Sequence, residues 1–383
     1  MKNHIRRAAL LLVVSATIST SSARGSIYVT NIGPDKIGKY NDDGTAANSS
    51  LVTGLSNPYG LVLSDDATSL FVTGFFVGSV GQYDATTGAA INPSLITGLT
   101  APIGIALSGD NLFISDSSAG TIGKYTTSGA TINAALVSGL SQPRNVAVSK
   151  DGTKLFVAES LQGAIKLYDA NTGATLNDAL VAGLNAPWGI ALSADESSIY
   201  VTESGLSRIG HYNAANGAPI NVELVFGLNQ PHGIALSGSN LFVANSGNGT
   251  IGKYAVSGAV FSEGFISGIG NPSAIVVNSV PLLGDFDGDS DIDIVDYLQL
   301  STNLFTNVTA LTTQQSYVLG DFTGDLRING DDFVRFRTAY DEANGVGAFV
   351  AMVNALPEPS TGLLAGVACA MLIWRRRPLD RTG

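Results

Sequence analysis

The chain has 383 residues, of which 45% are hydrophobic and 13% are charged, and its formal net charge is −11 at pH 7. A nucleic-acid-binding surface must be basic, so this charge argues against a nucleic-acid partner. The 45 glycines and the low charge content favour a β-rich protein with many tight turns over a disordered chain. The single cysteine, Cys369, rules out a disulfide framework within the chain.

The first 23 residues have the pattern of a secretory signal peptide. Three basic residues precede an apolar segment, Ala8 to Val14, which is too short for an ordinary membrane span. The small residues Ser21 and Ala23 fit cleavage after position 23. The sequence therefore predicts export to the cell surface, the outer envelope or the extracellular matrix.

A short apolar strand recurs six times between residues 27 and 279. Its copies begin at Ile27, Leu70, Leu112, Leu155, Ile199 and Leu241, at intervals of 43, 42, 43, 44 and 42 residues. This interval is the length of a four-stranded propeller blade. Each copy is followed by a strand that ends in Tyr and by a turn whose proline suits the first residue of the next strand. We therefore predict a mainly β fold, a six-bladed β-propeller of four-stranded blades over residues 27–279.

The order of the repeated strands also predicts how the ring closes. The series begins with a second strand at Ile27 and ends with a first strand at Pro272 to Asn278. The segment from Ile275 to Val277 should therefore pair with Ile27 to Thr30, which would cover two exposed strand edges. The repeat resembles NHL and related YVTN-type propellers, a class that includes lyases, lactonases and binding scaffolds.

One position in each repeat varies while its neighbours recur, namely the residue after the strand-opening proline. The six residues at this position are Tyr59, Ile103, Arg144, Trp188, His232 and Ser273. In a propeller this position should lie near the mouth of the central channel, and Tyr, Trp, Arg and His often form binding hot spots. We therefore predict a ligand-binding face around Tyr59, Arg144, Trp188 and His232. Three residues that end second strands, Asp116, Glu159 and Glu203, should add carboxylates to this face.

Two other interpretations of these residues remain open. They also fit ordinary decoration of a channel mouth, since exposed polar residues are common on loops. In an enzyme, Asp116, Glu159 and Glu203 would serve as bases or as ligands of a divalent ion. A three-histidine zinc site is excluded, because only His211 and His232 remain after removal of the signal peptide.

The acidic residues point to a separate calcium-binding module. Residues 281–345 hold 12 Asp and Glu against 3 Lys and Arg, whereas residues 27–279 hold 17 against 9, which predicts a domain boundary near residue 280. Carboxylates stand at loop positions 1, 3, 5, 9 and 12 of residues 285–296, the spacing with which oxygen ligands surround Ca²⁺. A second copy begins 36 residues later. The predicted metal ligands are Asp285, Asp287, Asp289, Asp291, Asp293 and Asp296 in the first loop, and Asp321, Thr323, Asp325, Arg327, Asn329 and Asp332 in the second, with Asp291 and Arg327 acting through their carbonyls. A solvated acidic turn is the alternative, but without a cation its charges would repel one another.

Both loops resemble those of type I dockerins, in which Asp commonly closes the loop and a helix follows. The resemblance covers residues 282–342 and implies a small α-helical module with paired EF-hand-like loops, calcium as the cofactor and a cohesin-like partner. Helices are expected over residues 297–305 and 333–340. Ser290 and Leu326 replace the glycine that eases the turn at loop position 6, which should weaken calcium binding.

The C-terminal residues have the pattern of a sorting signal. A linker over residues 343–356 precedes the motif Pro357, Glu358 and Pro359, which is followed by an apolar run and then three arginines. The apolar run would form a short transmembrane segment, and the arginines would hold its end in the cytoplasm. Residues 357–377 resemble a PEP-CTERM signal, which implies processing by a sorting peptidase of the exosortase type.

These features lead to two functional hypotheses. The first is an exported cell-surface or extracellular binding or scaffold protein, whose propeller face holds an extracellular protein or polysaccharide. The alternative is a propeller enzyme of the lyase or lactonase type, which would act on a carbohydrate-derived or cyclic substrate.

Overall fold

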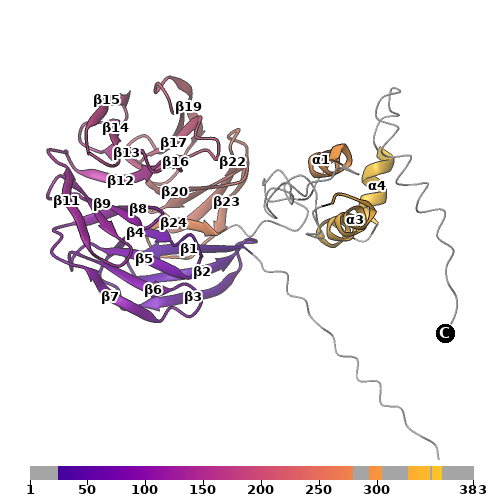
Figure 1. Ribbon diagram of the computed structural model, residues 1–383, viewed down its shortest axis with the longest axis horizontal. Helices are drawn as coiled ribbons and strands as arrows, with labels where there is room; N and C mark the ends of the chain where they lie inside the picture. Colours follow the sequence, from indigo (N-terminus) through magenta and orange to yellow (C-terminus); the bar gives the residue numbers. More distant parts are fainter. Residues whose placement is uncertain (1–24, 279–291, 293, 304–326, 346, 356–383) are drawn as a thin grey trace, which may run out of the picture.

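The computed structural model describes residues 25–278, 292, 294–303, 327–345 and 347–355. Residues 26–278 form 24 strands in six antiparallel four-stranded sheets, which are the blades of a propeller (Figure 1). This confirms the predicted six-bladed fold. In Figure 1 the outer strands β3, β7, β11, β15 and β19 lie along the periphery of the ring.

The blades are numbered in chain order from the one that contains the first strand. Blade 1 consists of β24 (Pro272–Asn278), β1 (Ser26–Asn31), β2 (Lys36–Asn41) and β3 (Ala46–Thr53). Blade 2 consists of β4 (Pro58–Leu63), β5 (Ser69–Gly74), β6 (Ser79–Asp84) and β7 (Ala90–Ile96). Blade 3 consists of β8 (Pro102–Ser108), β9 (Asn111–Asp116), β10 (Thr121–Thr126) and β11 (Thr131–Val137).

The other three blades repeat this pattern. Blade 4 consists of β12 (Pro143–Val148), β13 (Lys154–Glu159), β14 (Ala164–Asp169) and β15 (Thr175–Ala182). Blade 5 consists of β16 (Pro187–Leu192), β17 (Ser198–Glu203), β18 (Arg208–Asn213) and β19 (Pro219–Phe226). Blade 6 consists of β20 (Pro231–Ser237), β21 (Asn240–Asn245), β22 (Thr250–Ala255) and β23 (Val260–Ile266).

The two ends of the repeat series meet in blade 1. Strand β24 pairs with β1 in the register Ile27↔Val277, Tyr28↔Val276 and Val29↔Ile275. This is the predicted closure of the ring. It joins the first and last parts of the propeller chain in one sheet, so neither strand has an unpaired edge at this junction.

Hydroxyl groups connect the inner strands of adjacent blades. Thr73 Oγ1 accepts a hydrogen bond from Gly60 N at 2.7 Å and donates one to Ile103 O at 2.9 Å. A Cβ atom on Gly60 would collide with the same Ile103 carbonyl, so only glycine allows the two strands to approach this closely. The inner strands therefore leave little open space around the axis.

The outer strands are exposed, and each contains a bulge. In blade 4 the register shifts between Leu167↔Asn177 and Ile165↔Val181, and Asn177 Oδ1 accepts a hydrogen bond from Ala179 N at 3.1 Å within the bulge. Asparagines occupy the equivalent place in β3, β7, β11 and β19. Because a bulge interrupts a free edge, this feature limits pairing with strands of other molecules.

Three helices follow the propeller in the described part of the chain. They are α1 (Ile294–Asn303), α3 (Gly330–Asn344) and α4 (Ala348–Ala355). Tyr297, Phe336 and Phe349 come from the three helices and pack in one buried cluster. Helix α4 lies within residues 343–356, the predicted linker, and its Phe349 is buried in this cluster.

Candidate binding face at the channel mouth

The first strand of every blade contributes to the central channel. The channel contains a cavity of about 40 Å³, lined by Tyr59, Gly60, Leu61, Ile103, Gly104, Ile105, Asn145, Trp188, Gly233, Ile234, Ser273, Ala274 and Ile275. A cavity of this size has room for a few water molecules. Pockets for drug-sized ligands are about 300–1,000 Å³, so a larger ligand would have to bind outside this cavity.

Two aromatic side chains meet across the mouth of the channel. Tyr59 belongs to blade 2 and Trp188 to blade 5, and these blades lie opposite each other because neighbouring inner strands follow the order β24, β4, β8, β12, β16, β20. Their ring centroids are 6.1 Å apart, with an interplanar angle of 25°. Both rings line the cavity, so together they form a bridge over it.

Trp188 also lies between side chains from the two neighbouring blades. The imidazole of His232 stacks on the indole at a centroid distance of 3.8 Å and an angle of 7°. The guanidinium carbon of Arg144 lies 4.3 Å from the indole centroid. Two groups this close to one ring cannot share a face, and Trp188 stands between blades 4 and 6, so Arg144 and His232 cover opposite faces.

Burial and charge change the titration of this cluster. Burial lowers the pKa of His232 to about 4, and the charge of Arg144 contributes to the lowering, so the imidazole is neutral at pH 7. Burial also lowers the pKa of Arg144 and raises that of Tyr59. Arg144 Nε and His232 Nδ1 are buried and have no hydrogen-bond partner. The cluster therefore holds one guanidinium and one neutral imidazole with unused polar atoms.

The turn after β5 extends the aromatic cluster towards solvent. Phe75 lies 5.3 Å from Tyr59, and Phe76 lies 5.4 Å from Phe75, measured between ring centroids. The Phe76 side chain is 76% exposed. We did not predict these two residues from the sequence. The signal was present, however, because the five corresponding turns of the other blades contain no aromatic residue.

The carboxylates predicted for this face are buried instead. Asp116, Glu159 and Glu203 pair with the strand-opening prolines, so they lie at the mouth end of the blades, but their exposure is 4%, 1% and 0%. Asp116 accepts hydrogen bonds from Thr100 N at 2.6 Å and Ala101 N at 3.0 Å. The structure does not bring the three acids together, since each stands in a different blade and two of them bind backbone N–H groups of the preceding turn.

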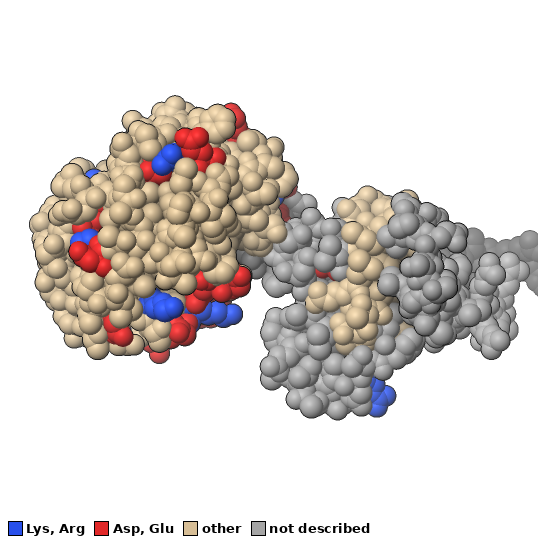
Figure 2. All heavy atoms as spheres, turned by 90° about the horizontal axis from the view of Figure 1, so that it is seen from above, with Lys and Arg blue, Asp and Glu red and all other residues tan. Residues whose placement is uncertain are grey.

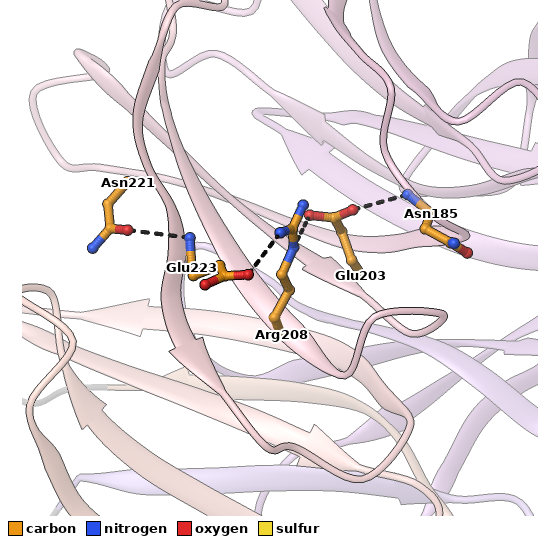
Figure 3. Close-up of polar contacts among 5 residues, drawn as sticks. All are labelled: Asn185, Glu203, Arg208, Asn221 and Glu223. Carbon is orange, nitrogen blue, oxygen red and sulfur yellow. Dashed lines mark hydrogen bonds and ion pairs between the residues drawn. The ribbon is translucent and has the colours of Figure 1, made fainter.

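Glu203 has a cationic partner across its own hairpin (Figure 3). Arg208 Nε donates to Glu203 Oε1 at 2.7 Å, and Asn185 N donates to Glu203 Oε2 at 2.8 Å. The Arg208 guanidinium also lies 3.5 Å from Glu223. Both oxygens of the buried Glu203 carboxylate are thus bonded, which is what a buried charge requires.

Glu159 obtains its cation from a different position. Its partner across the hairpin is Ala164, and the ammonium of Lys166 lies 3.4 Å from Glu159 and 3.0 Å from Asp178. Burial raises the pKa of Glu159 despite the opposing effect of Lys166. The five other blades have glycine at the position of Lys166, where a Cβ atom would collide with the tyrosine two residues later.

The two ends of the propeller differ in charge. The twelve turns at the mouth end contain one charged residue, Asp35. The described turns at the other end contain eight acidic residues, namely Asp42, Asp43, Asp65, Asp66, Asp110, Asp151, Asp195 and Glu196, and a single base, Lys150. Figure 2 shows that charged side chains form a few small groups separated by wide uncharged areas. The turns of the mouth face are thus almost uncharged, and this face carries the exposed Phe76.

Only part of the predicted calcium module belongs to the described residues. Asp296 and Asp332 are fully buried in the first turns of α1 and α3, and Ile292 and Ile328, four residues earlier, pack in the same core. Asn329 caps α3, and its backbone N–H donates a hydrogen bond to Asp332 Oδ2 at 2.8 Å. The side chain of Arg327 is exposed. The other predicted ligands, Asp285, Asp287, Asp289, Asp291, Asp293, Asp321, Thr323 and Asp325, lie outside the described residues. Within the part of the chain that is described, no three Asp, Glu, His or Cys side chains form a metal-binding group.

The predicted terminal signals also lie outside the described residues. They comprise residues 1–23 and the segment 357–377 with Pro357, Glu358 and Pro359. No helix in the described ranges is long and apolar enough to cross a membrane.

Comparison with known proteins identifies relatives of the propeller. The model of the virginiamycin B lyase family matches residues 11–277. No curated protein matches the chain. Among solved structures, the nidogen/laminin complex contains a chain that is 18% identical, with a TM-score of 0.59 and coverage of 66% of this chain and 98% of the other.

Two bacterial structures are similar in the same region. A functionally unknown protein from Desulfotomaculum acetoxidans is 19% identical, with a TM-score of 0.50 and coverage of 67% and 99%. A candidate 6-phosphogluconolactonase from Bacteroides fragilis is 14% identical, with a TM-score of 0.51 and coverage of 68% and 99%. At these identities the likeness establishes the propeller fold alone.

Proposed function

The chain belongs to the virginiamycin B lyase family, and within this propeller family we propose that it is an exported binding or scaffold protein whose mouth face holds a ligand or partner. The observation that carries the proposal is the aromatic cluster of Phe76, Phe75, Tyr59, Trp188 and His232 on an almost uncharged face. Aromatic and arginine side chains contribute much of the binding energy at protein interfaces. The cavity below is too small for a large ligand, so contact would occur on the face itself.

The proposal also includes export of the protein and calcium binding by the C-terminal module. The signal-peptide pattern of residues 1–23 and the sorting pattern of residues 357–377 support a location at the cell surface or in the extracellular matrix. The ligand spacing of residues 285–296 and 321–332 supports a calcium-stabilised module that spaces or docks the propeller, with a cohesin-like protein as one candidate partner. The buried Asp296 and Asp332 at matching positions of α1 and α3 fit such a paired arrangement.

The binding proposal is tested with the mature protein on a glycan array and in pull-down experiments with extracellular proteins. Phe76→Ser should abolish or strongly weaken capture, since it removes an aromatic side chain that is 76% exposed on the mouth face. Phe261→Ser is the matched control, because Phe261 is 61% exposed near the start of β23, at the other end of the blade. Equal binding by the wild type and both variants would contradict a role for the mouth face.

A lyase or lactonase acting on a cyclic substrate is the second candidate function. Family membership supports it, and His232 at the channel mouth is a candidate site residue, because its neutral imidazole could form a hydrogen bond with a substrate at pH 7. Incubation of the purified protein with virginiamycin B, with and without divalent ions, would test it by mass spectrometry. Turnover that His232→Gln abolishes would favour the enzyme, whereas an unchanged substrate would contradict this activity.

A further inference from the structure

Arg144 is a cation without an anionic partner. Ion pairs occur at Lys166 and Arg208, but no described carboxylate pairs with Arg144. Its polar contact is Nη2 to Gln142 Oε1 at 3.3 Å, and its Nε atom is buried without a partner. A partly buried charge without a counterion is costly, so an external anion would be strongly favoured at this position.

The contact with Trp188 positions Arg144 for such a ligand. The guanidinium carbon lies 4.3 Å from the indole centroid, so the aromatic ring attracts the cation and helps to hold it in place. A carboxylate is the matching anion, since it accepts two parallel hydrogen bonds from an arginine. His232 supports the opposite face of Trp188 at 3.8 Å, so Trp188 and His232 act as positioning residues.

The surroundings of Arg144 indicate what carries the anion. The exposed Phe76 and the half-buried Phe75 begin an aromatic surface that continues through Tyr59 to Trp188. The turns around it present exposed amides and hydroxyls, among them Gln142 and Gln162, and only one charge. Neutral donors and acceptors suit a ligand rich in hydroxyl groups, and an aromatic surface suits the apolar face of a ring.

We infer that the mouth face binds an acidic saccharide, with a ring carboxylate held by Arg144 and a sugar face resting on the Phe75–Phe76 surface. This inference rests on the proposed binding function and specifies the ligand class of that site. The single unpaired guanidinium fits one carboxylate at a time. Arg208, which begins β18 at the same end of the propeller, already pairs with Glu203 and Glu223.

Binding of trigalacturonate and of its methyl ester would test the inference by titration calorimetry on the mature protein. The two ligands share their rings and size but differ in charge. We expect Arg144→Gln to weaken binding of the acid by about ten- to a hundredfold, as expected for loss of a charged hydrogen bond, and to leave the ester unaffected. Arg144→Lys should retain part of the affinity. Lys150→Gln, which removes one positive charge from a turn at the other end of the propeller, is the matched control.

An array that pairs uronate-containing glycans with neutral counterparts extends the test to other sugars. Preference for the acidic members, lost in Arg144→Gln, would support the inference. Three outcomes would overturn it. They are a preference for the neutral members, equal effects of Arg144→Gln and Lys150→Gln on binding, and no binding to any acidic glycan. If the protein captured neutral glycans or proteins in a way that depends on Phe76, the proposed binding function would stand. Failure of the saccharide inference is thereby distinguished from failure of the binding function. Thermal melting of Arg144→Gln shows whether the variant is folded.

Discussion

Tyr59 and Trp188 come from opposite blades, and their rings meet 6.1 Å apart over the channel cavity. This contact ties the two sides of the ring together at the mouth. It also lies beside Arg144, whose guanidinium carbon is 4.3 Å from the Trp188 ring centroid. The same Trp188 side chain thus covers the channel cavity and contacts the arginine of the proposed binding site.

Replacement of Trp188 should therefore affect stability and binding together. Trp188→Ala removes the stacking with Tyr59 and His232 and the cation–π contact with Arg144, which together are worth about 2 kcal/mol. We expect that loss in the free energy of unfolding, measured by urea denaturation, and a clear loss of ligand capture. Trp188→Phe keeps a ring for stacking and should retain most of both. A stable Trp188→Ala protein that binds like the wild type would show that the bridge has no role.

His232 should make the propeller sensitive to acid. Its pKa is about 4 in the folded protein and about 6.5 in the unfolded chain, so the unfolded state takes up the proton first as the pH falls. Stability should be complete above pH 6.5 and should decrease between pH 6.5 and 4, by at most roughly 3 kcal/mol. His232→Gln should remove this part of the pH dependence. NMR titration of the imidazole gives the pKa directly, and a value near 6.5 would refute the burial argument.

The pair of Arg208 and Glu203 should be important for stability rather than for binding. Arg208→Met leaves a carboxylate that is 0% exposed without its cation, which typically costs about 3–5 kcal/mol. The double variant Arg208→Met/Glu203→Gln removes the charge but keeps an acceptor for Asn185 N, so it should recover most of the loss. Urea denaturation of the three proteins measures the difference. If the double variant were no more stable than Arg208→Met, the buried charge would not be the cause.

Much of the fold followed from the repeat in the sequence, because a blade-length interval and the offset of the first and last strands have few structural solutions. The pairing of Ile27 with Val277 is one result. The position after the proline also indicated where Tyr59 and Trp188 would lie. Their mutual contact could not be predicted, since it depends on the width of the ring and on side-chain rotamers. The burial of Glu203 was missed because the sequence does not reveal that the preceding turn needs an acceptor for its free N–H groups.

Strand β24 should be essential for a cooperative propeller. Deletion of Pro272–Asn278 would leave β1 without its inner neighbour and would break the contact between blades 6 and 2 through β24. Exposed strand edges promote association, so we expect aggregation and loss of a single cooperative melting transition. Light scattering and calorimetry would measure both. Truncation after residue 278 is the control, and a deletion variant that melts like this control would disprove the six-blade closure.

Calcium should stabilise the C-terminal module, and the first loop should bind it more tightly than the second. The first loop carries carboxylates at five ligand positions, whereas the second has Thr323 and Asn329 at two of these positions and Arg327 adds an opposing charge. Calorimetric titration of the mature protein should therefore show two sites, and Asp285→Ala should reduce affinity more than Asp321→Ala. Because metal binding to the folded state adds to stability, chelation should lower the melting temperature of the helical part. A larger loss of affinity in Asp321→Ala would show that the second loop binds calcium more tightly than the first. An absence of heat and of thermal stabilisation would rule out the calcium module.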